Sequence, residues 1–273
     1  MKKTLLAVLA FGMLASPAWA RRSLELLQDN YLGKPDGIDP TWTLPYDRVA
    51  GLSSERDTFV DASWTAEDLV VPAEREYNVQ RIKWIALLDT SPYAEYEYAD
   101  IVIYPANPDP NGDPIAPGTS PVLQFSDVPL DSLISLNDSL YGYAFYEGTV
   151  TLPGQGEGGS AVWLSQGHYY YAVRVVGNHG GRHLIATTGG DMGHPDQNEF
   201  GAGRMGAFWS LNFYQNHWVY VDDVLKVPDP DTGKLVPYAT DFAYQIWGEQ
   251  REIPEPASLA LVALGGLLFL IRR

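Results

Sequence analysis

The chain has 273 residues and no cysteine, which excludes disulfides, zinc–thiolate sites and thiol nucleophiles. Its formal net charge is −16, from 18 basic and 34 acidic residues. Four of the basic and one of the acidic residues lie outside residues 21–254. That range therefore carries 14 basic and 33 acidic groups, a net charge of −19. Such a surface repels phosphate backbones and anionic headgroups, so no nucleic-acid partner is expected.

The first twenty residues have the three regions of a secretory signal peptide. Two lysines precede an apolar run over 5–14, and Ala18 and Ala20 supply the small side chains that signal peptidase accepts. The run is apolar on every face, unlike an amphipathic helix of a folded domain. Residues 1–20 are therefore predicted to be a signal peptide, with Arg21 the first mature residue. The Sec export machinery and signal peptidase are the expected partners.

Residues 21–57 are interpreted as an irregular N-terminal arm. Apolar residues spaced three and four apart predict a short helix over 23–32. From 34 to 55 the chain is rich in Pro, Asp and Gly, which is typical of turns.

Residues 58–250 are predicted to form one all-β domain, an antiparallel β-sandwich. Short strand-like runs alternate there with clusters of Pro, Gly, Asp and Asn, a pattern that βαβ units do not show. The expected strands are 81–88, 99–104, 122–125, 141–152, 168–176, 217–221 and 240–247.

Alternation within these runs predicts which side chains are buried. In the first run the inward residues are Ile82, Trp84, Ala86 and Leu88, with Arg81 and Lys83 outward. In the last run the inward residues are Phe242, Tyr244 and Ile246, and the outward ones are Asp241, Ala243 and Gln245. Arg174 is expected to mark a wet face of its strand, and Gly142 and Gly148 to bend theirs.

Three histidines and two aspartates lie close together in a glycine-rich stretch: His179, His183, Asp191, His194 and Asp196. A transition-metal site is one hypothesis. Without cysteine or a helical frame nothing fixes the ligand geometry, so a surface loop with solvated side chains is the favoured interpretation.

Two acidic turns alternate oxygen-bearing side chains that could bind calcium: Asp109, Asn111, Asp113, Asp229 and Asp231. Neither turn matches the twelve-residue calcium loop or carries its closing glutamate. The same residues are what ordinary turns require. A plain turn is the default, so no cofactor is predicted, and calcium is the one candidate.

The chain holds 17 Tyr, 9 Phe and 8 Trp, enough to suggest sugar stacking. Tyr169, Tyr170 and Tyr171 alternate faces, so at least one ring is expected to be exposed, and Trp209, Trp218 and Trp247 are further candidates. A sandwich core also uses many aromatics. No Gly-Xaa-Ser-Xaa-Gly motif is present and no carboxylate pair stands out, so no catalytic residue and no enzyme activity are predicted.

The segment 251–273 has three consecutive parts. Pro254, Glu255 and Pro256 precede an apolar run over 257–271, which Arg272 and Arg273 close. Fifteen helical residues span about 22 Å, less than the ~30 Å hydrocarbon core. Two cations after such a run stop it on the cytoplasmic face. A plain membrane anchor is the alternative interpretation.

This tripartite pattern resembles the PEP-CTERM sorting signal, which exosortase, an integral-membrane enzyme of Gram-negative bacteria, processes. The runs Val79–Trp84, Gly167–Tyr170 and Asp241–Ile246, in that order, resemble a jelly-roll-like domain of bacterial surface proteins over 58–248. The resemblance implies exosortase as a partner and a transmembrane helix over 257–271 that anchors the exported chain transiently before it reaches the cell surface or is secreted.

The resemblance also implies a structural or adhesive role at the cell surface or in an extracellular matrix, linked to exopolysaccharide or biofilm, which makes exopolysaccharide a further expected partner. A carbohydrate-binding module is the alternative, and an extracellular hydrolase is third. Exposed coplanar aromatics would favour sugar binding, and a cleft with paired carboxylates would favour hydrolysis. Neither feature would favour the structural role.

Overall fold

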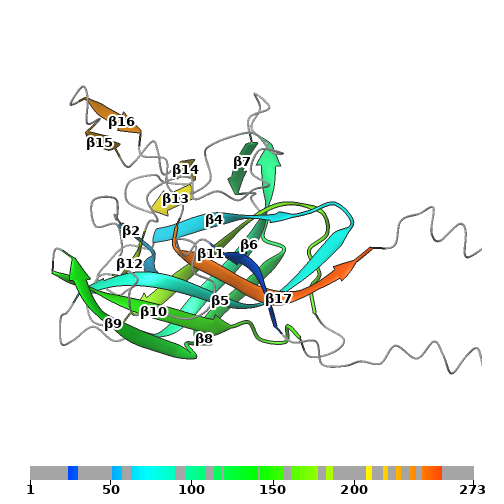
Figure 1. The fold of residues 1–273 in the computed structure, drawn as a ribbon, viewed down its shortest axis with the longest axis horizontal. Helices are drawn as coiled ribbons and strands as arrows, with labels where there is room; N and C mark the ends of the chain where they lie inside the picture. The colour runs from blue at the N-terminus through cyan, green and yellow to red at the C-terminus, as the bar shows by residue number, and fades with distance from the viewer. Residues whose placement is uncertain are drawn as a thin grey trace, which may run out of the picture.

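The computed structural model describes residues 24–29, 51–56, 63–89, 96–108, 114–117, 120–140, 142–156, 161–177, 183–186, 207–210, 218–220, 226–228, 234–237 and 242–253. Within these ranges the chain forms 17 strands and no helix (Figure 1). All but one of the strand pairings are antiparallel, so the predicted all-β class is confirmed.

The first sheet has seven strands, in the order β1-β17-β5-β10-β9, with β12 beside β5 and β2 beside β12. Its strands are β1 (Glu25–Asp29), β2 (Gly51–Ser53), β5 (Arg75–Asp89), β9 (Ser132–Leu140), β10 (Tyr143–Thr151), β12 (His183–Ala186) and β17 (Tyr244–Glu252).

The second sheet has eight strands, in the order β14-β13-β4-β11-β6-β7, with β8 also on β6 and β3 parallel to β11. Its strands are β3 (Glu55–Arg56), β4 (Ser63–Val71), β6 (Tyr96–Pro108), β7 (Pro114–Pro117), β8 (Leu123–Pro129), β11 (Gly167–Gly177), β13 (Ala207–Ser210) and β14 (Val219–Tyr220). A separate hairpin pairs β15 (Lys226–Pro228) with β16 (Leu235–Pro237).

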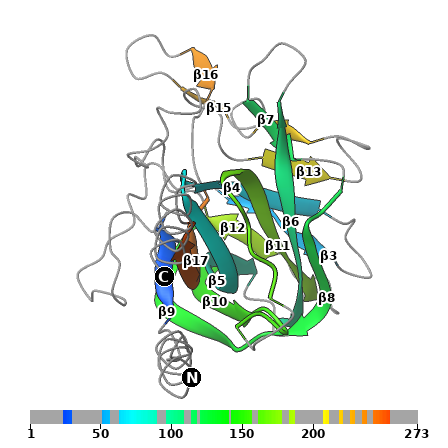
Figure 2. The ribbon, with the colours of Figure 1, turned by 90° about the vertical axis from the view of Figure 1, so that its right-hand side faces the viewer.

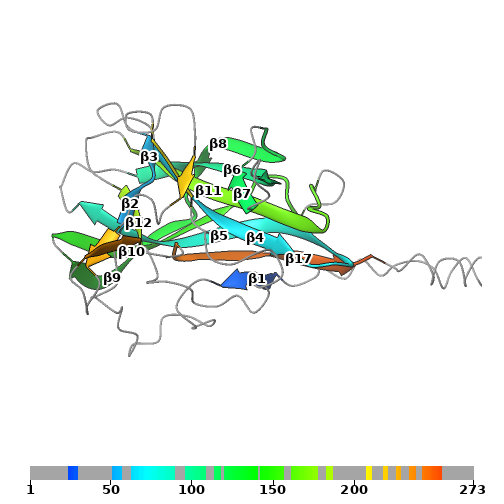
Figure 3. The ribbon, with the colours of Figure 1, turned by 90° about the horizontal axis from the view of Figure 1, so that it is seen from above.

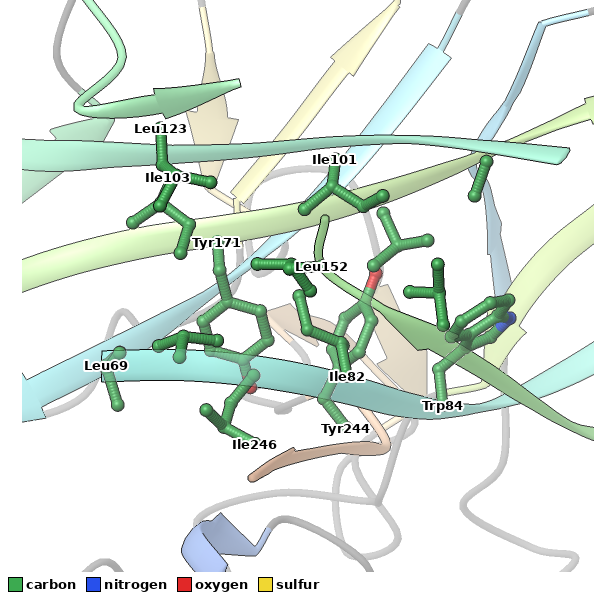
Figure 4. Close-up of a cluster of buried hydrophobic side chains, with 14 of the residues drawn as sticks. Leu69, Ile82, Trp84, Ile101, Ile103, Leu123, Leu152, Tyr171, Tyr244 and Ile246 are labelled. Carbon is green, nitrogen blue, oxygen red and sulfur yellow. The ribbon is translucent and has the colours of Figure 1, made fainter. Parts of the chain in front are cut away.

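The two sheets lie in two layers, with β5 and β17 in one and β6 and β11 in the other (Figures 2 and 3). The main core fills the space between them. Ile82 and Trp84 of β5 and Tyr244 of β17 meet Tyr171 of β11 and Ile101 of β6 there, all essentially without solvent exposure (Figure 4). Burying each such side chain contributes about 1.5–3 kcal/mol, so the core between the two sheets contributes most of the stability of the fold.

Each of the seven predicted strands overlaps an observed one, and the inward faces predicted for β5 and β17 are confirmed. The alternation predicted for β17 holds, but its outward face is buried instead of exposed to solvent. Ala243 and Gln245 are each only 4 % exposed. Ala243 belongs to a second apolar cluster with Ile85 and Leu87 of β5, so the seven-stranded sheet is covered on both faces along part of its length.

The predicted irregular arm also needs correction. The helix predicted over 23–32 is replaced by β1, and β2 and β3 occupy 51–56. Each of these short strands pairs with a strand far along the chain: β1 with β17, β2 with β12 and β3 with β11. The arm therefore contributes strands to both sheets.

The two glycines predicted to bend a strand have different roles. Gly142 has φ +88°, a left-handed conformation that glycine adopts without strain, just before β10 begins. Gly148 instead makes room for packing, because a Cβ there would lie 2.3 Å from the indole of Trp84 on the paired strand.

Candidate functional site

The outer face of the eight-stranded sheet carries the densest set of polar and aromatic side chains among the described residues. On β11, Tyr171 and Val173 point into the main core, so Tyr170, Ala172 and Arg174 point the other way. The register places Tyr170 between Asp68 of β4 and Tyr104 of β6, and Arg174 opposite Asp100 of β6. Strands β4, β11 and β6 thus bring their outward side chains together.

Asp100 is the centre of an ion-pair network on this face. Its carboxylate is 4 % exposed and accepts hydrogen bonds from Arg56 (Nε at 3.0 Å, Nη2 at 3.2 Å) and Arg174 (Nη2 at 2.7 Å, Nε at 3.1 Å). The backbone N–H of Asp127 donates a further bond of 3.0 Å, and φ of +52° at Asp127 turns this group towards the carboxylate. Five donors on one buried carboxylate satisfy its hydrogen-bonding capacity.

Burial and hydrogen bonding oppose each other in this network. Desolvation by itself would raise the pKa of Asp100, but the two arginines and the Asp127 N–H hold it below its ordinary value. Hydrogen bonding to Asp100 raises the pKa of Arg56. For the more deeply placed Arg174, desolvation is the largest effect and the pKa is lowered. Since Arg174 still donates to Asp100 through two nitrogens, we treat all three groups as charged.

Aromatic rings flank the network. The guanidinium of Arg174 lies 4.1 Å from the ring centroid of Trp64, a cation–π contact. Tyr104 and Trp218 meet edge to face, with centroids 6.2 Å apart and planes at 71°. These three rings are partly exposed, but the 71° angle does not make Tyr104 and Trp218 a flat stacking platform.

A second polar pair lies further along the same face. His168 Nε2 and Asp68 Oδ2 are 2.9 Å apart, with side chains only 10 % and 5 % exposed. His168 stacks on Tyr170, with centroids 5.6 Å apart and planes at 11°. The neighbouring Glu67, fully buried, accepts hydrogen bonds from the backbone N–H groups of Asp68 and Phe242. This arrangement ties β4 to the segment before β17.

The exposure predicted for the tyrosine triplet is wrong. Tyr169 is 9 % exposed, and Tyr170 and Tyr171 are fully buried. Tyr170 is covered because the outer face is itself packed, with Trp64, Ala106 and Trp218 against it. Among the other tryptophan candidates, Trp247 is partly exposed and bonds Gln245, whereas the side chain of Trp209 lies outside what the structure describes.

His183 does not lie in a solvated loop, which corrects a second prediction. It is fully buried on β12. Its Nε2 accepts from the indole N–H of Trp84 (3.2 Å), so Nδ1 carries the proton and donates to the Ser54 carbonyl (3.1 Å). Desolvation lowers the pKa of His183 to about 3, against the smaller effect of the Ser54 bond. The side chain is therefore a neutral core residue.

The calcium candidates lie outside the described residues, as do the other members of the histidine stretch. Asp109, Asn111 and Asp113 fall between the antiparallel partners β6 and β7, and Asp229 and Asp231 between β15 and β16. Within the ranges that the structure covers, no group of three or more His, Asp or Glu side chains is arranged to hold a metal ion.

The predicted signal peptide and residues 254–273 of the predicted sorting signal also lie outside the described residues, and with them Ala18, Ala20, Pro254, Glu255, Pro256, Arg272 and Arg273. In the part that is described, no helix is long and apolar enough to cross a membrane. Comparison of the chain with models of protein families, with curated proteins and with solved structures finds no match.

Proposed function

We propose that the chain is exported, anchored transiently by residues 257–271 and processed by exosortase, and that its β-domain then has a structural or adhesive role at the cell surface or in an exopolysaccharide-rich matrix. In this proposal the two packed sheets form a jelly-roll-like sandwich. The single observation that carries it is the order of Pro254–Glu255–Pro256, an apolar run and a terminal arginine pair directly after the last described strand.

The position of the last strand supports this reading. β17 ends at Glu252, and the backbone N–H of Ile253 bonds the carbonyl of Glu74 at 2.7 Å. The motif begins at the next residue. Every described strand therefore precedes the motif, and removing the residues after it would take no described strand from either sheet.

The side-chain chemistry of the described residues also supports a structural role. Their buried charged groups bond each other or the backbone, as at Asp100 and Glu67, instead of converging on an open cleft. A surface with net charge −19 over residues 21–254 keeps copies apart in solution, as a protein secreted into a hydrated matrix requires.

The test replaces Pro254, Glu255 and Pro256 together by alanine in the full chain, in its native host. Without the motif the enzyme has no substrate, so the full-length protein should accumulate in the inner-membrane fraction while the wild type leaves it. The matched control is alanine at Glu249, an acidic residue of β17 before the motif. Equal release of the motif variant and the wild type would refute the proposal.

The second candidate is a carbohydrate-binding module. It rests on the partly exposed rings of Trp64, Tyr104 and Trp218, because sugars stack on aromatic faces, although the rings of Tyr104 and Trp218 are not coplanar. A glycan array with residues 21–253 tests it. Binding that Trp218→Ala abolishes, and that Trp247→Ala retains, would place a sugar site on this face.

A hydrolase is the third candidate. The described residues include one half-open hollow of about 380 Å³, lined by Glu25, Arg75, Gln250, Arg251 and Glu252. Gln250 donates a hydrogen bond to Glu25, and Arg75 and Arg251 line the same hollow. The carboxylates of Glu25 and Glu252 therefore lie among cations and an amide, and do not form an isolated acid–base pair of the kind a glycosidase uses.

A further inference from the structure

The end of β17 is held closed by a small set of contacts that we call the clasp: Glu74, Arg75, Glu76, Trp163 and residues 250–253. The backbone of residues 250–253 is paired with residues 74–77. Gln250, Arg251 and Glu252 stand opposite Tyr77, Glu76 and Arg75 at the start of β5, and the Ile253 N–H bonds the Glu74 carbonyl. Glu74 itself has φ +64° in the tight turn between β4 and β5.

Side chains reinforce this pairing. Arg251 forms an ion pair with Glu76, and its guanidinium lies 4.1 Å from the ring centroid of Trp163. Arg75 Nη1 donates to Gln250 Oε1 at 2.8 Å, and Gln250 Nε2 donates to Glu25 of β1 at 2.8 Å. Three strands, β1, β5 and β17, thus meet at the point where the chain leaves the sheet.

These contacts are of the kind that open easily. The Arg251 side chain is 47 % exposed, and exposed ion pairs contribute little to stability. The hollow of about 380 Å³ lies among the same residues, so they lack dense packing on that side. By contrast, Tyr244 and Ile246, at the other end of the same strand, are fully buried. The end of β17 can therefore fray while the core stays folded.

An enzyme that cuts a peptide binds it as an extended strand and makes hydrogen bonds to its backbone. The residues that would enter the enzyme ahead of Pro254 are Arg251, Glu252 and Ile253. In the closed clasp their backbone pairs with the start of β5 and with Glu74 just before it. The folded domain therefore lies directly beside the motif. The enzyme and β5 compete for the same short segment.

Building on the proposed function, we propose that residues 250–253 form the upstream part of the segment that the processing enzyme binds, and that fraying of the clasp controls the rate of processing. Arg251 and Glu76 are then positioning residues, because they act on the availability of the motif and not on the cleaved bond. The closed clasp slows release, and its opening exposes the strand that the enzyme needs.

The first experiment measures processing of the full chain by pulse-chase labelling in its native host. Arg251→Ala removes both the ion pair and the cation–π contact. We expect cleavage about fivefold faster, equivalent to a loss of about 1 kcal/mol in the closed state. Arg81→Ala is the matched control, since Arg81 lies on the same sheet opposite Trp247, away from the strand end. It should process at the wild-type rate.

A second variant tests the opposite direction. The chain has no cysteine, so Arg75→Cys with Glu252→Cys introduces a single pair at two facing positions of β5 and β17. The disulfide should hold the clasp shut and block processing, and reduction should restore it. The melting temperature of each variant shows whether the domain remains folded.

The outcomes separate the two proposals. Wild-type rates for both Arg251→Ala and the oxidised cysteine pair, with retention of the variant that lacks Pro254–Glu255–Pro256, would overturn the clasp and leave exosortase processing standing. Unchanged release of that motif variant would overturn both. Faster processing of Arg251→Ala together with a reversible block in the cysteine pair supports both.

Discussion

Among the described residues the same three-part contact of a carboxylate, an arginine and a tryptophan ring occurs twice, once buried and once exposed. On the outer face of the larger sheet, Asp100 pairs with Arg174, which lies 4.1 Å from the Trp64 ring. At the end of β17, Glu76 pairs with Arg251, which lies 4.1 Å from the Trp163 ring.

Burial separates the two. The Arg174 and Asp100 side chains are 15 % and 4 % exposed, whereas those of Arg251 and Glu76 are 47 % and 20 % exposed. Removing one member of a buried pair leaves a charge without compensation, while an exposed charge recovers water. We therefore interpret the first contact as a lock between strands and the second as a clasp that can open.

The two contacts should differ most in the stability lost when the carboxylate of each is removed in a separate variant. Asp100→Ala leaves Arg56 and Arg174 facing each other and the Asp127 N–H without its acceptor. We expect a loss of about 2–4 kcal/mol in the free energy of unfolding by urea. Glu76→Ala should cost less than about 1 kcal/mol. Equal losses at the two sites would refute the distinction by burial.

Acid should weaken the interior through His183. The folded protein holds His183 at a pKa of about 3, while the unfolded chain takes up a proton below about 6.5. Because only the unfolded chain binds this proton between pH 6.5 and pH 3, the free energy of unfolding falls as the pH drops below 6.5. We expect a loss of about 2 kcal/mol between pH 7 and pH 5.

His183→Asn removes this titration, so comparing urea midpoints of variant and wild type at both pH values isolates it. A pH-dependent loss of the same size in His183→Asn would show that other groups cause it.

Salt should act on the clasp more than on the lock. At 1 M ionic strength the screening length is about 3 Å, and exposed pairs are screened far more than buried ones. Hydrogen exchange of the amides of Arg251 and Ile253, which face the start of β5, should accelerate in 1 M NaCl, while that of Arg174 stays slow. Uniform acceleration along β17 and β11 would indicate that both contacts are equally open to solvent.

The strands that sequence reasoning located are those with strict alternation, such as Ile82 and Trp84 in β5, because a half-buried strand repeats every two residues. β4 was missed since Glu67 and Asp68 interrupt its apolar pattern, yet both are buried and bonded. The helix predicted at 23–32 relied on the spacing of Leu24 and Leu27. In β1 the register shifts between Leu26 and Gln28, so Leu27 lies at an irregularity of the strand. This irregularity breaks the two-residue repeat of a strand, and the spacing of Leu24 and Leu27 then looks like that of a helix.

The polar contacts depend on partners that no local pattern connects. Asp100 meets Arg56 and Arg174 from 44 and 74 residues away. The burial of His183 depends on Trp84, 99 residues away, although its glycine-rich surroundings indicated a loop. Such contacts follow from strand order, which a single sequence does not specify. The two targeting segments stay predictions, which rest on composition and the order of their parts and lie outside the described residues.

The central claim is that the mature protein consists of the β-domain freed from both targeting segments. Mass spectrometry of the protein released from cells tests it most directly. We expect an N-terminus at Arg21 and no peptide from residues 259–273. Intact peptides covering Leu259–Arg273 in released material, or Met1 at its N-terminus, would contradict the account.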